Sequence, residues 1–333
     1  MSGSLSGCRA FVTGADGFIG SHLVEALVAQ GAQVRALVYY NSWNTTGWLE
    51  DCDRHLIDQV EIVTGDVRDG EQMRTSIADC DYVFHLASLI AIPYSYAAPA
   101  SYVQTNVLGT LNILQAARYS DKLKRVVHVS TSEVYGSAQT VPISETHPLV
   151  AQSPYAASKV GADKLAESFH LSFGLPVTTG RPFNTFGPRQ TARAVIPTIA
   201  SQLIARSGSL RIGALYPTRD FNFVGDTAAG LIALALSEEA EGETVNIGSG
   251  KEWSIAQTVD LLCEIIGHTP EILSEEARQR PADSEVARLI ADTAKIGRLT
   301  GWQSSVPFRD GLERTVRWIE RNIDKFDVDQ YAR

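Results

Sequence analysis

The sequence is poor in cysteine and has no long apolar run. Among 333 residues there are four cysteines, which are scattered without a C-x-x-C pair: Cys8, Cys52, Cys80 and Cys263. We therefore expect reduced thiols, as in a cytoplasmic protein. No apolar stretch is long enough to span a membrane, and the first residues lack the basic and apolar regions of a signal peptide. The sequence thus predicts no association with a membrane.

Basic charge is also scarce. The net charge is −9, which argues against nucleic acid as the main partner. The seven histidines show no pair at a spacing suited to metal ligation with carboxylates, so we expect no metal. With 44% hydrophobic and 20% charged residues, the composition is that of an ordinary globular protein with one large domain or two unequal ones.

A glycine-rich segment stands near the N-terminus, where residues 13–20 read T-G-A-D-G-F-I-G. An apolar run at 9–13 precedes it and apolar residues at helical spacing follow it over 21–30, so it lies between a strand and a helix. Gly14 permits a tight turn, Gly17 allows the backbone to approach a phosphate, and Gly20 allows the helix to pack closely on the strand. We predict a dinucleotide site here, with Asp16, Phe18 and Ile19 also at the cofactor.

Strands and helices alternate along the rest of the first half. Apolar runs predict strands at 34–38, 60–64, 81–87, 125–130 and 176–181, and periodicity predicts long helices at 101–118 and 154–172. This alternation indicates an α/β fold with a doubly wound parallel sheet of the Rossmann kind. After residue 182 the elements are shorter, with helices expected near 194–206, 226–237 and 254–266 and strands at 210–213 and 244–248. We therefore divide the chain into a cofactor domain, 1–181, and a smaller substrate-binding lobe, 182–333, from which pieces such as 244–248 return to the main sheet.

A candidate catalytic pair lies on the second long helix. Tyr155 and Lys159 in Y-A-A-S-K are one helical turn apart and share a face. An adjacent ammonium lowers the pKa of a phenol, which predicts that Tyr155 acts as a general base. A surface Tyr–Lys pair would show the same spacing, so the prediction depends on its context.

Several motifs in order resemble the extended short-chain dehydrogenase/reductases of the NAD-dependent epimerase/dehydratase family. They are T-G-A-D-G-F-I-G, G-D-V-R-D (65–69), H-L-A-S (85–88), N-V-L-G-T (106–110), S-T-S-E-V-Y-G (130–136), Y-A-A-S-K, R-P-F-N-T-F-G-P-R (181–189) and R-D-F-N-F-V-G-D (219–226). The resemblance implies that Asp66 and Val67 line the adenine, that Leu86, Ala87 and Ser88 line the ribose and phosphates, and that Lys159 holds the nicotinamide ribose. It also places Asn106 near the active site.

The segment T-S-E at 131–133 indicates which reaction the resemblance implies. A carboxylate at Glu133 beside the sugar suits proton abstraction from C5, as a 4,6-dehydration requires, with Tyr155 at O4 and Thr131 bonded to the 4-oxygen. Ser132 stands where dTDP-glucose 4,6-dehydratases have an aspartate, so we expect Glu133 to act as base and then as acid. UDP-glucuronate decarboxylases share the triplet, and 4-epimerases share the fold, so both stay open. A non-catalytic NAD(P) sensor is disfavoured because Tyr155 and Lys159 are both present.

Substrate and cofactor follow from further resemblances. Segments 39–49, 89–96 and 280–289 are similar to retaining UDP-N-acetylglucosamine 4,6-dehydratases of legionaminic-acid-type pathways, which favours that UDP-sugar. The same resemblance implies that the nucleotide sugar is bound by Asn184, Arg193, Ile196, Arg219 and Arg280. After the second strand the chain has no acid for a ribose 2′-hydroxyl and no arginine for a 2′-phosphate, and we favour NAD. Family members often dimerise through the helices at 101–118 and 154–172, so we expect a homodimer or higher homo-oligomer.

Overall fold

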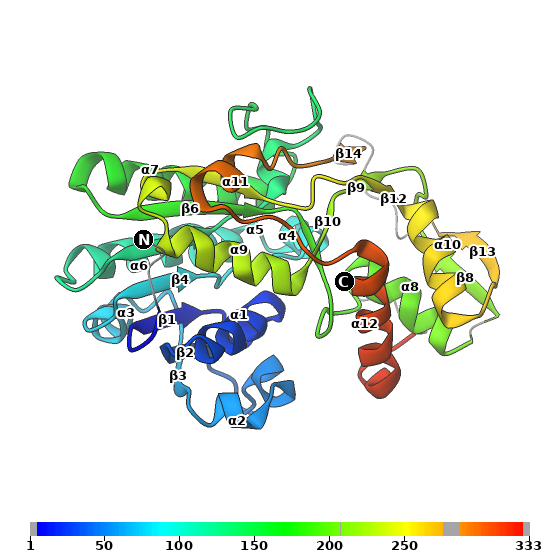
Figure 1. Ribbon diagram of the computed structural model, residues 1–333, viewed down its shortest axis with the longest axis horizontal. Helices are drawn as coiled ribbons and strands as arrows, with labels where there is room; N and C mark the ends of the chain where they lie inside the picture. The colour runs from blue at the N-terminus through cyan, green and yellow to red at the C-terminus, as the bar shows by residue number, and fades with distance from the viewer. Residues whose placement is uncertain (1–4, 207, 276–286, 329–333) are drawn as a thin grey trace.

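A seven-stranded parallel sheet forms the centre of the molecule (Figure 1). The computed structural model describes residues 5–206, 208–275 and 287–328. The strand order is β11-β6-β5-β4-β1-β2-β3. In chain order these strands are β1 Arg9–Thr13, β2 Gln33–Tyr39, β3 Glu61–Gly65, β4 Tyr82–His85, β5 Arg125–Val129, β6 Val177–Pro182 and β11 Thr244–Ile247. The order reverses between β1 and β4, and this topology confirms the predicted Rossmann fold.

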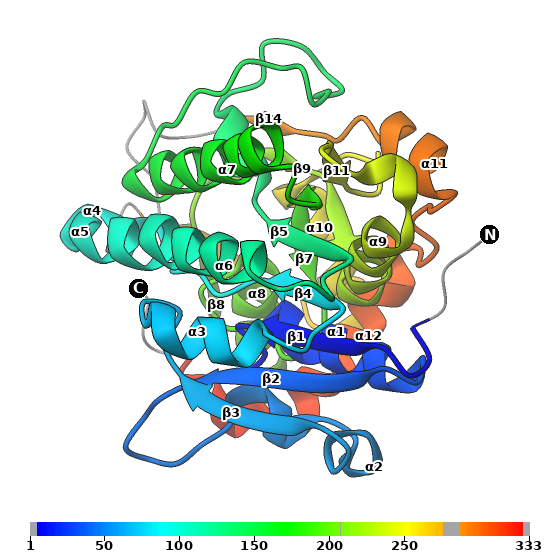
Figure 2. The same ribbon diagram turned by 90° about the vertical axis from the view of Figure 1, so that its left-hand side faces the viewer.

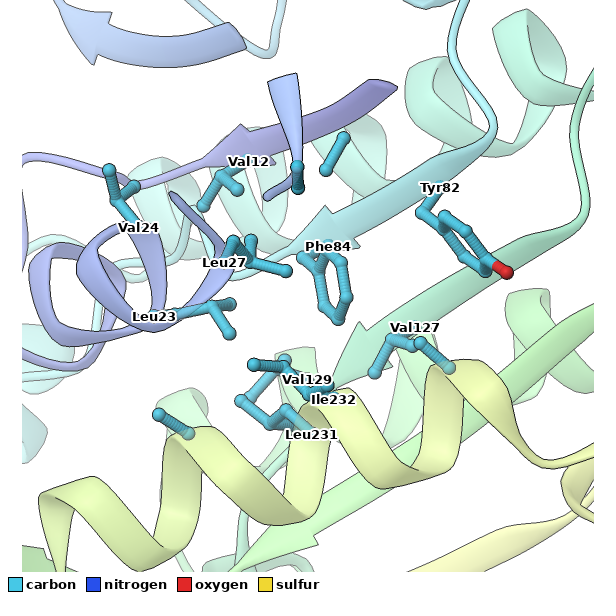
Figure 3. Close-up of a cluster of buried hydrophobic side chains, with 14 of the residues drawn as sticks. Val12, Leu23, Val24, Leu27, Tyr82, Phe84, Val127, Val129, Leu231 and Ile232 are labelled. Carbon is cyan, nitrogen blue, oxygen red and sulfur yellow. The ribbon is translucent and has the colours of Figure 1, made fainter. Parts of the chain in front are cut away.

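Helices cover both faces of the sheet (Figure 2). One face carries α1 (Phe18–Ala29), α9 (Val224–Leu236) and α11 (Ala294–Thr300), and the other carries α3 (Gly70–Ile77), α6 (Gly109–Arg118) and α7 (Pro154–Phe173). Figure 3 shows how Leu23 and Leu27 of α1 and Leu231 of α9 meet Val12 and Phe84 of the sheet. The central strands β1, β4 and β5 are buried on both faces, which explains their unbroken apolar runs, whereas the edge strand β3 is largely exposed.

Local signals set the ends of α7, the helix that carries Tyr155. Ser153 caps the N-terminus by accepting a hydrogen bond from the backbone N–H of Ala156, and Pro154 occupies the first turn, where its missing N–H costs nothing. Gly174 ends the helix in the left-handed conformation, with φ of +64°. The catalytic helix is therefore fixed at both ends by its own sequence.

The other predicted long helix, 101–118, is helical throughout but contains a π-helical stretch. Residues 101–118 divide into the end of α5 (Pro99–Tyr102), a π-helical segment (Val103–Leu108) and α6. The π-helical segment contains Asn106, whose buried side chain bonds both backbone groups of Leu89. Such insertions in a helix often occur at functional sites. The predicted helix is therefore present, and its π-helical stretch carries the buried amide of Asn106.

The lobe has its own core, built around Phe186, Phe221, Phe223 and Phe308. Its helices are α8 Val195–Ile204, α10 Ile255–Ile266 and α12 Phe308–Arg321, and its short strands are β7 Asn184–Phe186, β8 Ser209–Ile212, β9 Thr218–Arg219, β10 Phe221–Phe223, β12 Trp253–Ser254, β13 Glu271–Ser274 and β14 Arg288–Leu289. The segment after residue 182 contributes to the lobe and, through β11, to the main sheet. The domain boundary at residue 181 stays a prediction.

The remaining elements are short. They are the α-helices α2 Arg54–Ile57 and α4 Ile92–Ala97 and the 3-10 turns η1 Gly47–Asp51, η3 Ser132–Tyr135, η4 Glu238–Ala240 and η7 Ile323–Lys325. The four cysteines all lie among the described residues and form no disulfide. Across the part of the chain that the structure describes, no helix combines the length and apolarity needed to cross a bilayer.

Candidate active site

The glycine-rich turn leaves no room for side chains. A Cβ on Gly20 would lie 2.0 Å from the carbonyl oxygen of Gly14, and one on Gly14 would lie 2.9 Å from the backbone nitrogen of Ala87. Gly14 also has φ of +67°, which favours glycine. Gly17 begins α1 without a side-chain cap, so the first N–H groups of the helix point to a position where an anion can bind. The backbone therefore fits the pyrophosphate of a dinucleotide.

The end of β4 forms the opposite wall of this site. Backbone N–H groups of Leu86 and Ala87 both donate to the hydroxyl oxygen of Thr13, at 3.1 Å each. His85 is held between hydroxyls of Thr13 and Thr110, at 2.9 and 3.0 Å. The hydroxyl of Ser88 is buried and has no partner among the described residues, which fits a polar group of a bound cofactor.

A cleft of about 650 Å³ opens at the ends of β2 and β3, beside the adenine residues that the resemblance implies. Asp66 lines it and binds Arg68 in an ion pair, which lowers the pKa of the Asp66 carboxyl. Val67 instead points into the core, where it packs against Gly109. Of the two, only Asp66 presents its side chain to the cleft.

The predicted catalytic groups converge at the end of β5. Thr131 accepts a hydrogen bond from the backbone N–H of Glu133 at 3.2 Å and is also bonded to the Tyr155 hydroxyl. Glu133 lies close enough to Tyr155 for its charge to raise the pKa of the phenol. Ser132 is buried beside them. The structure thus brings Thr131, Glu133 and Tyr155 into one site.

Burial determines the protonation of the Tyr–Lys pair. Burial raises the pKa of Tyr155 well above its usual value, and the bond with Thr131 offsets only part of this rise. Lys159 donates to the carbonyl oxygen of Val129 at 2.8 Å, and its burial lowers its own pKa to about 8. In the protein without cofactor, desolvation thus dominates the pKa of the phenol, and the lowering expected from Lys159 with oxidised nicotinamide stays a prediction.

The residues predicted to bind the nucleotide sugar are more dispersed. Asn184 begins β7 with its amide oxygen buried and without a partner among the described residues, and Arg219 is buried on β9. Arg193 is exposed, near Tyr102. Ile196 is packed in the lobe core, so its side chain is not available to a ligand. Arg280 lies outside the described residues.

Comparison with known proteins identifies the family. The family model described as GDP-mannose 4,6 dehydratase matches residues 11–315. A curated dTDP-glucose 4,6-dehydratase from Actinoplanes sp. is 34% identical over 319 residues, covering 94% of this chain and 98% of that protein. The chain belongs to the NAD-dependent epimerase/dehydratase family of extended short-chain dehydrogenases/reductases.

Solved structures of similar proteins include both kinds of enzyme in this family. DesIV, a dTDP-glucose 4,6-dehydratase from Streptomyces venezuelae solved with NAD bound, superposes with a TM-score of 0.81 at 32% identity, covering 94% of this chain and 97% of DesIV. A UDP-N-acetylglucosamine 4-epimerase from Methanobrevibacter ruminantium M1, in complex with UDP-N-acetylmuramic acid, superposes with a TM-score of 0.85 at 30% identity, covering 95% and 99%. This epimerase/dehydratase is therefore similar over most of its length both to a 4,6-dehydratase and to a 4-epimerase.

A buried polar network lies beneath Lys159 of the epimerase/dehydratase. Asp163, one turn further along α7, accepts hydrogen bonds from Arg181 at 2.8 and 3.1 Å and pairs with His128 at 3.2 Å. Arg181 in turn donates to the hydroxyl of Tyr135 at 3.0 Å. The bonds from His128 and Arg181 outweigh the burial of Asp163 and lower the pKa of its carboxyl to about 2. Only the spacing of Lys159 and Asp163 on α7 could have indicated part of this network, because its other members come from β5, η3 and β6.

Two further side chains position Tyr155. The ring of Tyr102 packs edge-on against the Tyr155 ring, with centroids 6.2 Å apart, and its hydroxyl donates to the carbonyl oxygen of Ala91. Asn106 donates to the hydroxyl of Ser158 at 2.9 Å, and that hydroxyl donates to the carbonyl oxygen of Tyr155 at 2.7 Å. The sequence placed Asn106 near the site but gave no signal for Tyr102.

Metal chemistry was not expected. Within 5–206, 208–275 and 287–328, no three or more His, Cys, Asp or Glu side chains come together in a way that could hold a metal ion. The absence of a metal in the working enzyme stays a prediction.

Proposed function

We propose that this enzyme is an NAD-dependent nucleotide-sugar 4,6-dehydratase with UDP-N-acetylglucosamine as its substrate. The observation that carries the proposal is the carboxylate of Glu133 beside Tyr155 at the end of β5. A 4-epimerase requires a base at O4 but no second acid–base group at C5. The similarity to dTDP-glucose 4,6-dehydratases also favours dehydration.

The side chains can divide the reaction between them. Tyr155 takes the proton from O4, while Thr131 donates a hydrogen bond to that oxygen. Bound NAD would supply the hydride chemistry: it would accept the hydride of C4 and return it to C6 after water has left, while C5 regains a proton, so that the sugar loses only water. The 4-keto group acidifies the proton on C5, Glu133 removes this proton, and the C6 hydroxyl leaves as water. Because serine is too weak an acid to protonate that hydroxyl, Glu133 delivers the proton that it has taken, and Ser132 has no proton-transfer role.

The burial of Tyr155 makes this reaction dependent on the cofactor. Its raised pKa keeps the phenol protonated near neutral pH in the protein alone. Oxidised nicotinamide carries a positive charge, which stabilises a nearby phenolate. Tyr155 therefore acts as a base when the oxidised cofactor is bound, and Lys159 contributes to the same electrostatic field as long as it is protonated.

The choice of sugar is supported by loop resemblance. Residues 89–96 include most of α4, which packs against the catalytic helix α7. UDP-glucuronate decarboxylase is the second candidate, because the exposed Arg193 near Tyr102 offers a cation for a sugar carboxylate. We place Asn184 and Arg219 at the nucleotide diphosphate, where arginine can bind two oxygens at once.

We also propose that the enzyme is a cytoplasmic homodimer that associates through α6 and α7. Apolar side chains are exposed on α7 and on the π-helical segment that precedes α6, with Leu171 75%, Val103 51% and Leu108 47% exposed. Light scattering should give the mass of two chains, and a monomer at micromolar concentration would refute this part of the proposal.

Mass spectrometry of products tests the reaction. The purified enzyme with NAD is incubated separately with UDP-N-acetylglucosamine, GDP-mannose, dTDP-glucose and UDP-glucuronate. We expect UDP-N-acetylglucosamine to lose one water. An isomer of unchanged mass would show an epimerase, loss of carbon dioxide from UDP-glucuronate would show a decarboxylase, and water loss from another sugar alone would correct the substrate.

A further inference from the structure

The enzyme has no acidic residue directly after β2. NAD-binding Rossmann folds hold the ribose 2′-hydroxyl with an Asp or Glu at this place. Here β2 ends at Tyr39, and residues 39–46 read Y-Y-N-S-W-N-T-T. The next two acids are engaged elsewhere: Glu50 accepts the backbone N–H of Thr46 at 2.7 Å, and Asp51 pairs with Lys325 at 2.6 Å.

Another carboxylate reaches this corner from the glycine-rich turn. One oxygen of Asp16 accepts the backbone N–H of Tyr39 at 3.1 Å, which places the carboxylate at the carboxyl end of β2. The loop after β2 closes over the other side of Asp16. The backbone N–H of Trp48 donates to the Asp16 carbonyl oxygen at 3.0 Å, and a Cβ on Gly47 would lie 2.6 Å from that oxygen. Asp16 is thus held in place by hydrogen bonds to the end of β2 and to the loop that follows it.

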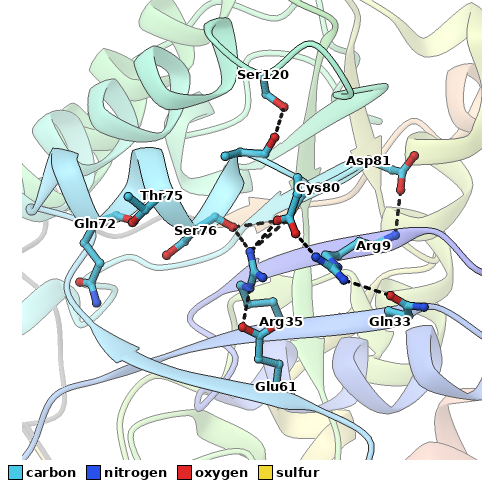
Figure 4. Close-up of polar contacts among 12 residues, drawn as sticks. Arg9, Gln33, Arg35, Glu61, Gln72, Thr75, Ser76, Cys80, Asp81 and Ser120 are labelled. Atoms are coloured by element: carbon cyan, nitrogen blue, oxygen red, sulfur yellow. Dashed lines mark hydrogen bonds and ion pairs between the residues drawn. The ribbon is translucent and has the colours of Figure 1, made fainter.

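Two cations near these strand ends, Arg68 and Lys325, are already paired, and the arginine of β2 itself lies at the other end of the strand. Figure 4 shows Arg35 turned toward Glu61 and the backbone of Ser76, with an ion pair of 2.9 Å and a hydrogen bond of 2.7 Å. Arg68 binds Asp66, and Lys325 binds Asp51. A phosphate at the ribose 2′-position would therefore meet the Asp16 carboxylate, and Arg68 and Lys325 would have to leave their partners to neutralise it.

We propose that Asp16 accepts a hydrogen bond from the 2′-hydroxyl of the adenosine ribose of NAD and excludes the 2′-phosphate of NADP. Asp16 replaces the acid that other NAD-binding folds supply after β2. Its bond to Tyr39 holds the carboxylate at the end of β2, and each carboxylate oxygen can accept more than one hydrogen bond, so a ribose hydroxyl can be added. The inference concerns the cofactor alone and holds whichever sugar the enzyme converts.

Binding of cofactor analogues tests this role without any turnover. Dissociation constants of NAD, 2′-deoxy-NAD and NADP are measured by calorimetry for the wild type, Asp16→Ala and Asp16→Asn. We expect 2′-deoxy-NAD to bind the wild type about tenfold more weakly than NAD, because a hydrogen bond to a charged acceptor is lost. Asp16→Ala should bind the two equally. Both variants should raise the affinity for NADP relative to NAD by about tenfold or more, because the repelling charge is gone.

The control is Asp51→Asn, which changes an acid in the adjoining turn η1 and should keep the tenfold sensitivity to the 2′-hydroxyl. Equal weakening of NAD and 2′-deoxy-NAD by Asp16→Ala would show that Asp16 only holds the loop after β2, and would overturn the proposal. If Asp16→Ala does not fold, Asp16→Asn still tests the proposal. Its amide oxygen can accept the hydrogen bond from the backbone N–H of Tyr39, while the negative charge is removed. An unchanged ratio of NADP to NAD affinity in Asp16→Asn would also overturn it.

Discussion

The cofactor side and the nucleotide-sugar side of this enzyme are built differently. At the cofactor side the backbone makes the site: Gly14 and Gly20 bring helix, strand and loop so close that a Cβ would collide with main-chain atoms. At the sugar side the candidate contacts are single side chains, Asn184, Arg193 and Arg219, on short elements of the lobe. A backbone site tolerates few substitutions, whereas a side-chain site can change its substrate one residue at a time.

This difference fits relatives that share the fold and differ in the sugar. The similar structures include a dTDP-glucose 4,6-dehydratase and a UDP-N-acetylglucosamine 4-epimerase with nearly complete coverage of the chain. A shared fold does not fix the substrate, so we expect the side chains around the sugar to decide the product.

The largest effect is expected at the glycine-rich turn. Gly20→Ala places a methyl group 2.0 Å from the Gly14 carbonyl oxygen, so the turn must move. A steric cost of about 1–3 kcal/mol corresponds to roughly ten- to hundredfold weaker NAD binding. Calorimetric titration with NAD measures it. Gly297→Ala on α11 is the control, because its Cβ would meet the Trp302 carbonyl oxygen only at 3.8 Å, and it should leave NAD affinity unchanged. Equal NAD affinity in both variants would remove the distinction between the two sides.

A smaller effect is expected from the burial of Lys159, which should make the free energy of unfolding depend on pH. Because burial lowers the pKa of Lys159 to about 8, the unfolded chain binds more protons than the folded chain from about pH 8 up to the ordinary lysine value near ~10.4. The contribution of Lys159 to stability should therefore rise with pH across this window, by at most about 1.36 kcal/mol per pH unit. Urea unfolding of the wild type and Lys159→Met at several pH values measures the difference.

The control for this measurement is Lys124→Met. Asp81 holds the pKa of the exposed Lys124 above its usual value, so its contribution should fall, rather than rise, as the pH increases through the alkaline range. If the difference in unfolding free energy between the wild type and Lys159→Met does not vary with pH, Lys159 is solvated. That result would contradict the burial of Lys159 beside the cofactor site.

The smallest effect is expected at the sugar side. Asn184→Ala removes a buried amide oxygen that has no partner among the described residues, and should raise the dissociation constant of UDP about three- to tenfold, as for loss of one hydrogen bond. NAD affinity should not change. If Asn184→Ala lost more affinity for NAD than for UDP, Asn184 would belong to the cofactor side, and the two sides would not be separate as described.

The sequence predicted most of the cofactor side because its signals are local. The glycines, the preceding strand and the following helix lie within some twenty residues, and Tyr155 and Lys159 lie on one helix. The contacts that it missed join distant parts of the chain. Tyr135 is 111 positions from Asn246, to which its hydroxyl donates at 2.7 Å, and no periodicity reports such a pair.

Two features depend on burial, which no spacing in the sequence measures. One is the raised pKa of the Tyr155 phenol. The other is Ile196, whose side chain helix α8 turns into the lobe core, while its place beside the nucleotide stays a prediction. The side-chain site was therefore the less predictable of the two.

The division of work between Tyr155 and Glu133 is tested most directly by nicotinamide absorbance in a single turnover with UDP-N-acetylglucosamine. In Glu133→Gln, oxidation at C4 should proceed without loss of water, so reduced nicotinamide should accumulate. In Tyr155→Phe, oxidation should slow by about 10²–10⁴-fold, and none should be seen on the same time scale. Normal product formation by Glu133→Gln, or no reduced nicotinamide in either variant while NAD binding is intact, would contradict the account.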